Sequence, residues 1–148
     1  MVVQTPRPFI VVGADGSPPS IKAVQWADRQ ARLTGADLHV VTGWEVRPTI
    51  YIVPTYTEAD YERDARKVLD KTVAEALGAE PGEHVTSTLY EGRPARALVV
   101  AADRAELLVI GSHGQGELPG MHLGSVASYC VHHCACPVVV VRDRTTGR

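Results

Sequence analysis

A glycine-rich segment between residues 111 and 125 is the part of the chain whose residue types and spacing point most directly to chemistry. It reads GSHGQGELPGMHLGS, in which Gly111, Gly114 and Gly124 are separated by two and nine residues. Gly111 and Gly114 can adopt positive φ and expose backbone N–H groups, and Ser125 adds a hydroxyl at the positive end of an expected helix. The segment therefore predicts an anion site, and a nucleotide phosphate tail is the anion we expect.

Simple turn formation is the alternative explanation for these glycines. However, five glycines lie in the fourteen residues 111–124, which is more than one turn requires. The apolar run 107–110 precedes the segment and a helical pattern follows it. A strand, a glycine loop and a helix in this order are typical of phosphate sites in α/β folds, so we favour binding.

Short apolar runs alternate with helical patterns along the whole chain. Strands are expected at residues 9–12, 38–44, 84–90, 107–110 and 137–141, and helices between residues 17 and 35, 57 and 78, 93 and 102, and 125 and 134. Regular alternation with short connections predicts a parallel sheet with helices on both faces. The unbroken β-branched run at 138–141 is typical of a strand buried on both faces.

A second polar loop, GADGS, follows the first expected strand and carries Asp15. Ligands of such sheets lie at the carboxyl ends of the strands, at the switch point of the topology. If the strands 9–12 and 107–110 are neighbours, Asp15 and the glycine segment form one site. Asp15 also has a local interpretation, since it can cap the following helix or form an Asx-turn.

Length, charge and composition restrict the class of protein. A chain of 148 residues fits one domain, for which we expect an ordered core at about 8–142. Fifteen basic and seventeen acidic residues give a formal charge of −2, with the arginines spread along the chain, so we expect no nucleic-acid partner. The opening residues fit neither a signal peptide nor a membrane span, so we expect no membrane partner and a cytoplasmic location.

Several nucleotide-binding motifs are missing. The chain has no G-x-x-x-x-G-K-[ST], and its lysines, Lys22, Lys67 and Lys71, lie far from the glycine segment. It also has no G-x-G-x-x-G after the first strand, no acidic cluster beyond Asp15 for a phosphoacceptor domain, and no His-x-Gly-His of nucleotidyl transferases. These classes are therefore disfavoured.

Three cysteines near the end of the chain allow two interpretations. Cys130 and Cys134 share a helix face and, with His133 and Cys136, could hold zinc. Core packing by small apolar side chains is the simpler explanation, and we expect no metal. The histidines expected to be exposed or structural, with no visible partner, are His39, His84 and His122.

The connection at residues 45–57 contains Pro48 and Pro54, which exclude regular structure, and is unusually apolar. Three placements stay open. The segment covers a bound nucleotide, offers a surface to a partner, or packs on the core.

Three separated segments together resemble the universal stress protein family in its ATP-binding branch. They are the opening VVGADGSPPS, the glycine pattern at 111–125, and the ending CPVVVV at 136–141, so the resemblance covers nearly the whole chain. It implies a doubly wound, Rossmann-like domain of the adenine nucleotide alpha hydrolase type, with a five-stranded parallel sheet in the order 3-2-1-4-5 and four helices. It also implies ATP, with or without Mg²⁺, a homodimer paired through Val138–Val141, and a regulatory or sensor role in stress response with an unknown partner.

The resemblance assigns positions to the ligand. Asp15 faces the adenosine and accepts hydrogen bonds from ribose hydroxyls, with the backbone of Gly13 and Ala14 beside it. Gly43 reads the adenine edge through its backbone, and Ile110 packs on the base. The phosphate-binding residues are Gly111, Ser112, His113 and Gly114, continued by Gln115 and Gly116, and then Gly124, Ser125, Val126 and Ala127.

The sequence departs from more basic family members at Gln115, where they often carry arginine or lysine. A neutral contact to phosphate is weaker than a charged one, so Gln115 predicts a weaker or more metal-dependent hold on the terminal phosphates. No catalytic group is evident, and we expect regulation instead of catalysis. The alternatives are a weak ATPase or phosphotransferase assisted by Asp15 or His113, and a nucleotide-free dimerisation module.

Overall fold

The computed structural model describes residues 6–46, 56–114 and 123–143. Within these ranges the chain forms five strands and four helices in strict alternation. They are β1 (Phe9–Gly13), α1 (Pro18–Thr34), β2 (Asp37–Trp44), α2 (Glu58–Leu77), β3 (Val85–Glu91), α3 (Pro94–Ala101), β4 (Leu107–Gly111), α4 (Ser125–His133) and β5 (Val138–Val141). The elements expected from the sequence are all present, with boundaries that differ by one or two residues.

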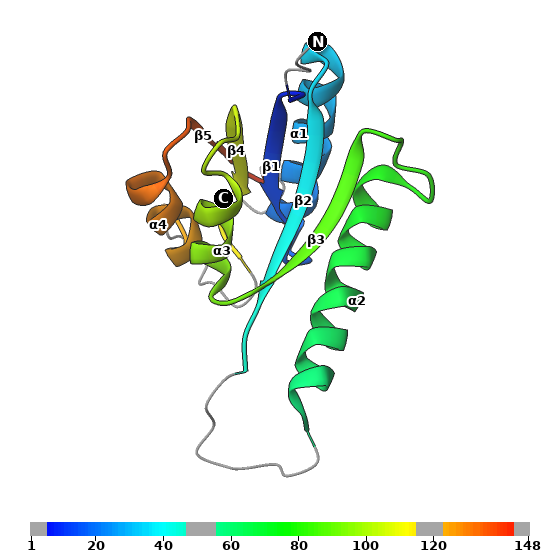
Figure 1. Cartoon of the computed structure of the whole chain (residues 1–148), viewed down its shortest axis with the longest axis vertical. Coiled ribbons are helices and arrows are strands. Elements are labelled where there is room, and N and C mark those ends of the chain that lie inside the picture. The colour runs from blue at the N-terminus through cyan, green and yellow to red at the C-terminus, as the bar shows by residue number, and fades with distance from the viewer. Residues whose placement is uncertain (1–5, 47–55, 115–122, 144–148) are drawn as a thin grey trace, which may run out of the picture.

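The strands form one parallel sheet in the order β3-β2-β1-β4-β5. Helices α1 and α2 pack on one face, and α3 and α4 pack on the other (Figure 1). The central strand β1 contributes to both cores, since Val11 and Val12 point to opposite faces and neither is exposed to solvent. The doubly wound sheet predicted from the sequence is confirmed.

Two helices begin at the capping residues that the sequence indicates. Ser17 accepts a hydrogen bond from the Ser20 N–H at 3.3 Å at the start of α1, with Pro18 as the first helical residue. Thr57 and Asp60 form a reciprocal capping box at the start of α2. Local side-chain chemistry therefore fixes where these helices start.

The position of β5 differs from the expectation. The prediction that this strand is buried on both faces is wrong for the single chain, because all four valines are only half-buried. The reason is topological: β5 lies at the edge of the sheet and has β4 as its one neighbour. A β-branched run indicates a strand but not its place in the sheet.

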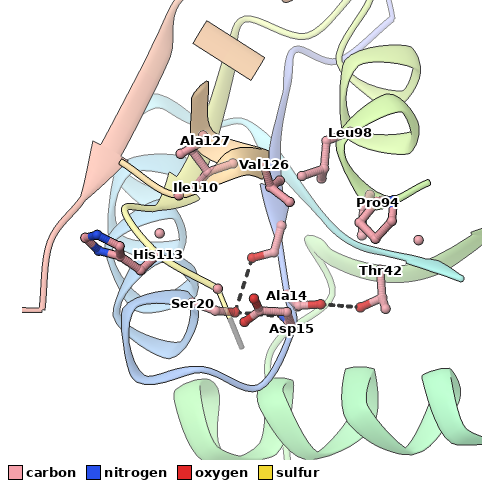
Figure 2. A pocket seen from close by; sticks show the side chains of 16 residues that line it. Ala14, Asp15, Ser20, Thr42, Pro94, Leu98, Ile110, His113, Val126 and Ala127 are labelled. Atoms are coloured by element: carbon pink, nitrogen blue, oxygen red, sulfur yellow. Dashed lines mark hydrogen bonds between the residues drawn. The ribbon is translucent and has the colours of Figure 1, made fainter. Parts of the chain in front are cut away.

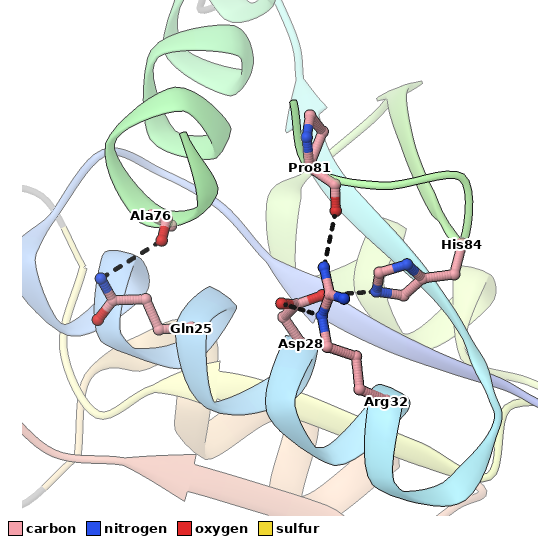
Figure 3. A network of polar contacts seen from close by, with 6 residues as sticks. All are labelled: Gln25, Asp28, Arg32, Ala76, Pro81 and His84. Carbon is pink, nitrogen blue, oxygen red and sulfur yellow. Dashed lines mark hydrogen bonds and ion pairs between the residues drawn. The ribbon is translucent and has the colours of Figure 1, made fainter. Parts of the chain in front are cut away.

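A polar network lies at the edge of the sheet where the strands begin, at their amino ends (Figure 3). Asp28 of α1 lies 2.6 Å from Nε2 of His84, just before β3, and 3.0 Å from Nε of Arg32. Arg32 also donates to the Pro81 carbonyl at 3.3 Å. His84, for which the sequence showed no partner, therefore forms a partly buried hydrogen bond with Asp28, which connects α1 to the segment just before β3.

Two features discussed from the sequence lie outside the described residues. They are most of the 45–57 connection, of which residues 47–55 are not described, and His122. His39 is described, and its ring stacks on Phe9 with centroids 4.5 Å apart.

Candidate functional site

The strands β1 and β4 lie side by side, but the chain leaves them in opposite directions. From β1 it crosses through α1 to β2 on one side, and from β4 it crosses through α4 to β5 on the other. Because α1 and α4 cover opposite faces, the carboxyl ends of β1 and β4 border an uncovered crevice. The loops that follow these two strands are the ones that carry Asp15 and the glycine segment.

A pocket occupies this crevice, with about 560 Å³ of space that is partly open to solvent. The polar contacts gather around Asp15 at one end, and apolar side chains from α3, β4 and α4 surround the other (Figure 2). Its lining residues are Gly13, Ala14, Asp15, Ser20, Val41, Thr42, Gly43, Pro94, Leu98, Ile110, Gly111, His113, Gly114, Gly124, Val126 and Ala127.

The loop after β1 is held by the start of α1. Oδ1 of Asp15 accepts hydrogen bonds from the N–H of Ser17 at 2.9 Å and from its hydroxyl at 2.5 Å, which is an Asx-turn. The Asp15 N–H donates to Oγ of Ser20 at 3.0 Å. The local interpretation of Asp15 is thus correct and does not compete with the binding one, because the same turn places Asp15 in the pocket wall.

A buried threonine on the neighbouring strand fixes the other side of this loop. The Thr42 hydroxyl donates to the Ala14 carbonyl at 2.6 Å, and the Ala14 N–H donates to the Val41 carbonyl at 2.9 Å. Thr42 is 8% exposed, so its hydroxyl bond is shielded from water. Together the two bonds extend the β1–β2 pairing to the residue before Asp15.

Gly111 ends β4, and its role differs from the one expected. The φ angle of Gly111 is not positive, so its backbone conformation does not by itself require glycine. Instead, a Cβ at this position would lie 2.8 Å from Cβ of Pro19 and 2.9 Å from the backbone N of Ser20. Glycine is needed because the strand end packs directly on the first turn of α1.

Ser112 joins the two ends of the glycine segment. It is 3% exposed, its N–H donates to the Val141 carbonyl at 2.8 Å, and its carbonyl accepts from the Gly124 N–H at 2.7 Å. Its hydroxyl lies 3.0 Å from Nδ1 of His113. Ser112 therefore holds β4, β5 and the start of α4 together, and it does not line the pocket.

Helix α4 directs its N-terminus to the same edge. Gly124 is its N-cap, with extended backbone and no capping side chain, and Val126 and Ala127 of the first turn line the pocket. The N–H groups of a first helical turn have no acceptor within the helix and carry the positive end of its dipole. This arrangement favours an anion at the α4 end of the pocket.

The apolar end of the pocket depends on α3. Pro94 and Leu98 of this helix face Ile110 of β4 and Val126 of α4 around the cavity (Figure 2). Gly43 permits the approach of α3, because a Cβ there would lie 2.7 Å from Cα of Pro94. Apolar walls of this kind, formed by a helix and a strand, suit an aromatic ring system.

The charge of the pocket is low. Among the described lining residues, Asp15 and His113 are the ones with titratable side chains, and none is lysine or arginine. An anion in this pocket would therefore be held mainly by backbone N–H groups and helix dipoles, as the sequence predicted.

The structure brings most of the predicted site residues together. Among those it describes, all except Ser112 and Ser125 line the pocket, while Gln115 and Gly116 lie outside the described residues. Sequence reasoning missed several lining residues, namely Ser20, Val41, Thr42, Pro94 and Leu98. Only Ser20 carried a signal, as a polar residue in the first turn of the helix after Asp15; the others are set by tertiary packing.

The zinc alternative for the cysteine cluster receives no support from the part of the chain that is described. There, no group of three or more His, Cys, Asp or Glu side chains is placed to hold a metal ion. Cys130 is fully buried in the core between α3, α4 and the sheet, which confirms its packing role.

None of the helices over the described residues is long and apolar enough to cross a membrane.

Comparison with known proteins shows which proteins this chain is similar to. Residues 9–142 match the model of the universal stress protein family. The chain is 33% identical over 152 residues to universal stress protein Rv1996 of Mycobacterium tuberculosis, covering 96% of this chain and 48% of that protein. It therefore spans about half the length of this mycobacterial relative. A universal stress protein of Thermus aquaticus is 35% identical over 135 residues, covering 90% of this chain and 97% of its own length.

A solved structure extends the comparison. A universal stress protein in complex with cAMP has a TM-score of 0.66 and 27% identity, with 93% of this chain and 98% of that chain covered.

Proposed function

This chain belongs to the universal stress protein family, and we propose that it binds ATP at the carboxyl edge of its sheet as a cytoplasmic regulatory or sensor module in a stress response. One observation carries the proposal: the loops after β1 and β4 and the N-terminus of α4 converge on one pocket that is polar at one end and apolar at the other. A nucleoside phosphate has the same division, with a flat base, a hydroxylated sugar and an anionic tail.

The base fits the apolar end of the pocket. Ile110 and Val126 offer aliphatic contacts to an aromatic ring, and Pro94 closes the slot from α3. Val41 and Gly43 bring the backbone of β2 to the cavity, where its polar groups can read the adenine edge. The ribose then lies near Asp15, whose carboxylate accepts hydrogen bonds from hydroxyl groups.

The phosphates fit the glycine segment. Gly111, His113 and Gly114 line the pocket on the β4 side, and Gly124 and Val126 line it on the α4 side. Two separate stretches of backbone N–H groups suit a chain of several phosphates better than they suit a single phosphate. The relative solved with cAMP supports an adenine nucleotide as the class of ligand, and ATP is our extension of that class.

The described pocket favours holding ATP over consuming it. Oδ1 of Asp15 is occupied by two hydrogen bonds from Ser17, which weakens a role as a base. No lysine or arginine of the described lining faces the phosphates, whereas phosphoryl transfer relies on positioned positive charge. We therefore propose that Mg²⁺ accompanies ATP and neutralises part of its charge.

The edge strand β5 supports a further part of the proposal, a homodimer. The carbonyls of Pro137 and Val141 accept hydrogen bonds from β4, so alternation along the strand directs the backbone of Val138 and Val140 outward. An edge of half-buried valines with outward N–H groups is a template for pairing with a second copy. Val140→Pro removes one outward N–H and should convert a dimer to a monomer in sedimentation, whereas an unchanged dimer would exclude this edge.

Ligand identification tests the binding proposal. Protein purified without added nucleotide is denatured, and the released small molecules are identified by mass spectrometry. Calorimetric titrations with ATP, ADP, cAMP and GTP then rank the ligands. Asp15→Glu and Gly114→Ala should weaken ATP binding, while Asp37→Glu, a matched change at the opposite end of the sheet beside Arg7, should not. Absence of adenine nucleotide binding at millimolar concentration would overturn the proposal.

A further inference from the structure

Two of the three cysteines form a close pair away from the pocket. Sγ of Cys134 and Sγ of Cys136 lie 3.4 Å apart, and both residues are half-buried. Cys134 follows the last residue of α4, and Cys136 lies two residues before β5. The pair therefore sits on the short connection between the last helix and the edge strand.

The local backbone brings these two thiols together. The Cys134 N–H closes the last turn of α4 on the Cys130 carbonyl at 2.9 Å, and Cys134 then adopts an extended conformation with ψ 139°. The chain bends at residues 135 and 136 before Pro137 leads into the sheet. This bend returns Cys136 to the same core cluster as Cys134, so that both sulfurs face one another across a single alanine.

We propose that Cys134 and Cys136 are a redox-modification site that forms a reversible disulfide within one chain by exchange with a low-molecular-weight disulfide. A disulfide has an S–S length of about 2.05 Å, so the sulfurs must approach by roughly 1.4 Å. Side-chain rotation on a bent connection can supply a movement of this size. This inference is independent of nucleotide binding.

The exchange balances as two successive substitutions. The thiolate of one cysteine of the pair attacks a small disulfide RSSR, forming a mixed disulfide and releasing RS⁻. The thiolate of the other cysteine then attacks the sulfur of the first, forming the Cys134–Cys136 bond and releasing the second RS⁻. Each cysteine gives up its proton and together they lose two electrons, and the small disulfide is reduced to two thiols.

Burial disfavours the thiolate forms of Cys136 and Cys130. Desolvation and the hydrogen bond with Cys134 raise the pKa of the Cys136 thiol to about 11, and burial raises the pKa of Cys130 to about 12. Thiols with these pKa values are almost entirely protonated near neutral pH, whereas the thiolate is the nucleophile. The two sulfurs of the pair are already adjacent, so either cysteine can resolve the mixed disulfide that the other forms.

The third cysteine is excluded by its position. Cys130 is not exposed to solvent, and its thiol points to the Ala95 carbonyl at 3.9 Å. A small disulfide cannot reach it without opening the contact between α3 and α4. It serves as an internal reference that should remain a thiol throughout.

The ring closed by a Cys134–Cys136 disulfide is too small to stabilise the fold appreciably. Cross-links stabilise mainly by restricting the unfolded chain, and the effect grows with the length of the closed loop. A bond between residues two positions apart restricts very little. A pair of this kind responds to the surrounding redox poise and contributes little to the stability of the fold.

The test uses the full chain with chelator present and oxidised glutathione as the probe. After acid quenching, unreacted thiols are alkylated under denaturing conditions and located by peptide mass spectrometry. The expected product has lost two hydrogens, has Cys134 and Cys136 linked and Cys130 alkylated, and forms in a yield independent of protein concentration. Dithiothreitol should restore the starting mass.

Single variants separate the two steps. Cys136→Ser and Cys134→Ser should each stop at one glutathione attached to the remaining cysteine of the pair, because neither variant has the second thiol that resolves the mixed disulfide. Cys130→Ala, the matched control, should still form the bond. A Cys130–Cys134 bond, disulfides only between chains, a wild-type product that retains glutathione, or no reaction would each overturn the proposal; since these outcomes are read on the wild-type chain, poor folding of a variant does not decide the result.

Discussion

Removal of the Thr42 hydroxyl tests whether the loop carrying Asp15 is held ready for ligand by the neighbouring strand. Thr42→Val keeps the shape of the side chain but deletes the 2.6 Å hydrogen bond to the Ala14 carbonyl. A net hydrogen bond is worth about 0.5–1.5 kcal/mol, and a buried carbonyl left without a partner costs about 1–3 kcal/mol. We therefore expect the free energy of unfolding to fall by about 2 kcal/mol, which corresponds to a decrease in Tm of roughly 4–8 °C.

The free energy of the hydrogen bond between Thr42 and Ala14 also limits how far the Thr42→Val variant can weaken ATP binding. If the loop leaves its binding conformation more often in the variant, the apparent Kd for ATP rises by the inverse of the competent fraction. Expressed as a free energy, that increase cannot exceed what the bond supplied, so a loss of about 1–2 kcal/mol raises the Kd by at most about 5- to 30-fold. Titration calorimetry measures the Kd, and urea unfolding measures the stability.

Thr72→Val is the matched control. Thr72 is also buried, and its hydroxyl donates to the backbone carbonyl of Val68 at 2.7 Å, but it lies in α2 and lines no part of the pocket. Because Val68 also accepts a helical hydrogen bond, we expect a loss of about 1 kcal/mol or less and an unchanged Kd. Equal effects of the two variants on Kd, or a Thr42→Val variant that is destabilised yet binds as wild type, would refute the reasoning.

Three further predictions concern the packing of the loops, the α2 cap and the polar network. Gly111→Ala should cost about 1–3 kcal/mol in urea unfolding, because its Cβ meets the backbone of α1, whereas Gly13→Ala meets only the end of a leucine side chain at 2.9 Å and should cost less; equal costs would contradict this. Hydrogen bonds from Thr57 lower the pKa of Asp60 from its ordinary value of 3.8, so the cap stabilises the protein above that pH and its contribution is lost as pH falls through the lowered value. The difference in unfolding free energy between wild type and Thr57→Ala should therefore shrink in acid, and a constant difference would exclude the charged cap. His84→Ala should lose roughly 1–3 kcal/mol in unfolding free energy with no change in ATP affinity, and a large affinity change would show that the two ends of the sheet are coupled.

Local chemistry explains why much of the fold was predictable. The start of α1 follows from a serine before two prolines, and the start of α2 follows from Thr57 and Asp60, because capping bonds join residues close in sequence. The apolar runs identify the strands, since a parallel sheet covered on both faces needs continuous apolar strands at its centre. These signals depend on near neighbours, and the printed sequence contains them.

The residues that complete the pocket carry no local sequence signal that predicts their role. Pro94 and Leu98 of α3 become pocket walls only because α3 packs beside the end of β2, where Gly43 leaves room for it. Thr42 becomes a loop anchor only because β2 pairs with β1 in one register. None of these three side chains has a type or spacing that marks it for its role.

The glycine segment shows both sides of this division. The sequence by itself determined that backbone N–H groups and a helix N-terminus are available near Gly111 and Gly124, because glycine content and helix starts are local properties. Only the tertiary structure decided that Gly111 is glycine for its contact with α1, that Ser112 joins the ends of the segment, and that Asp15 lies across the same pocket. Those facts depend on the order of strands in the sheet, which brings together residues almost one hundred positions apart.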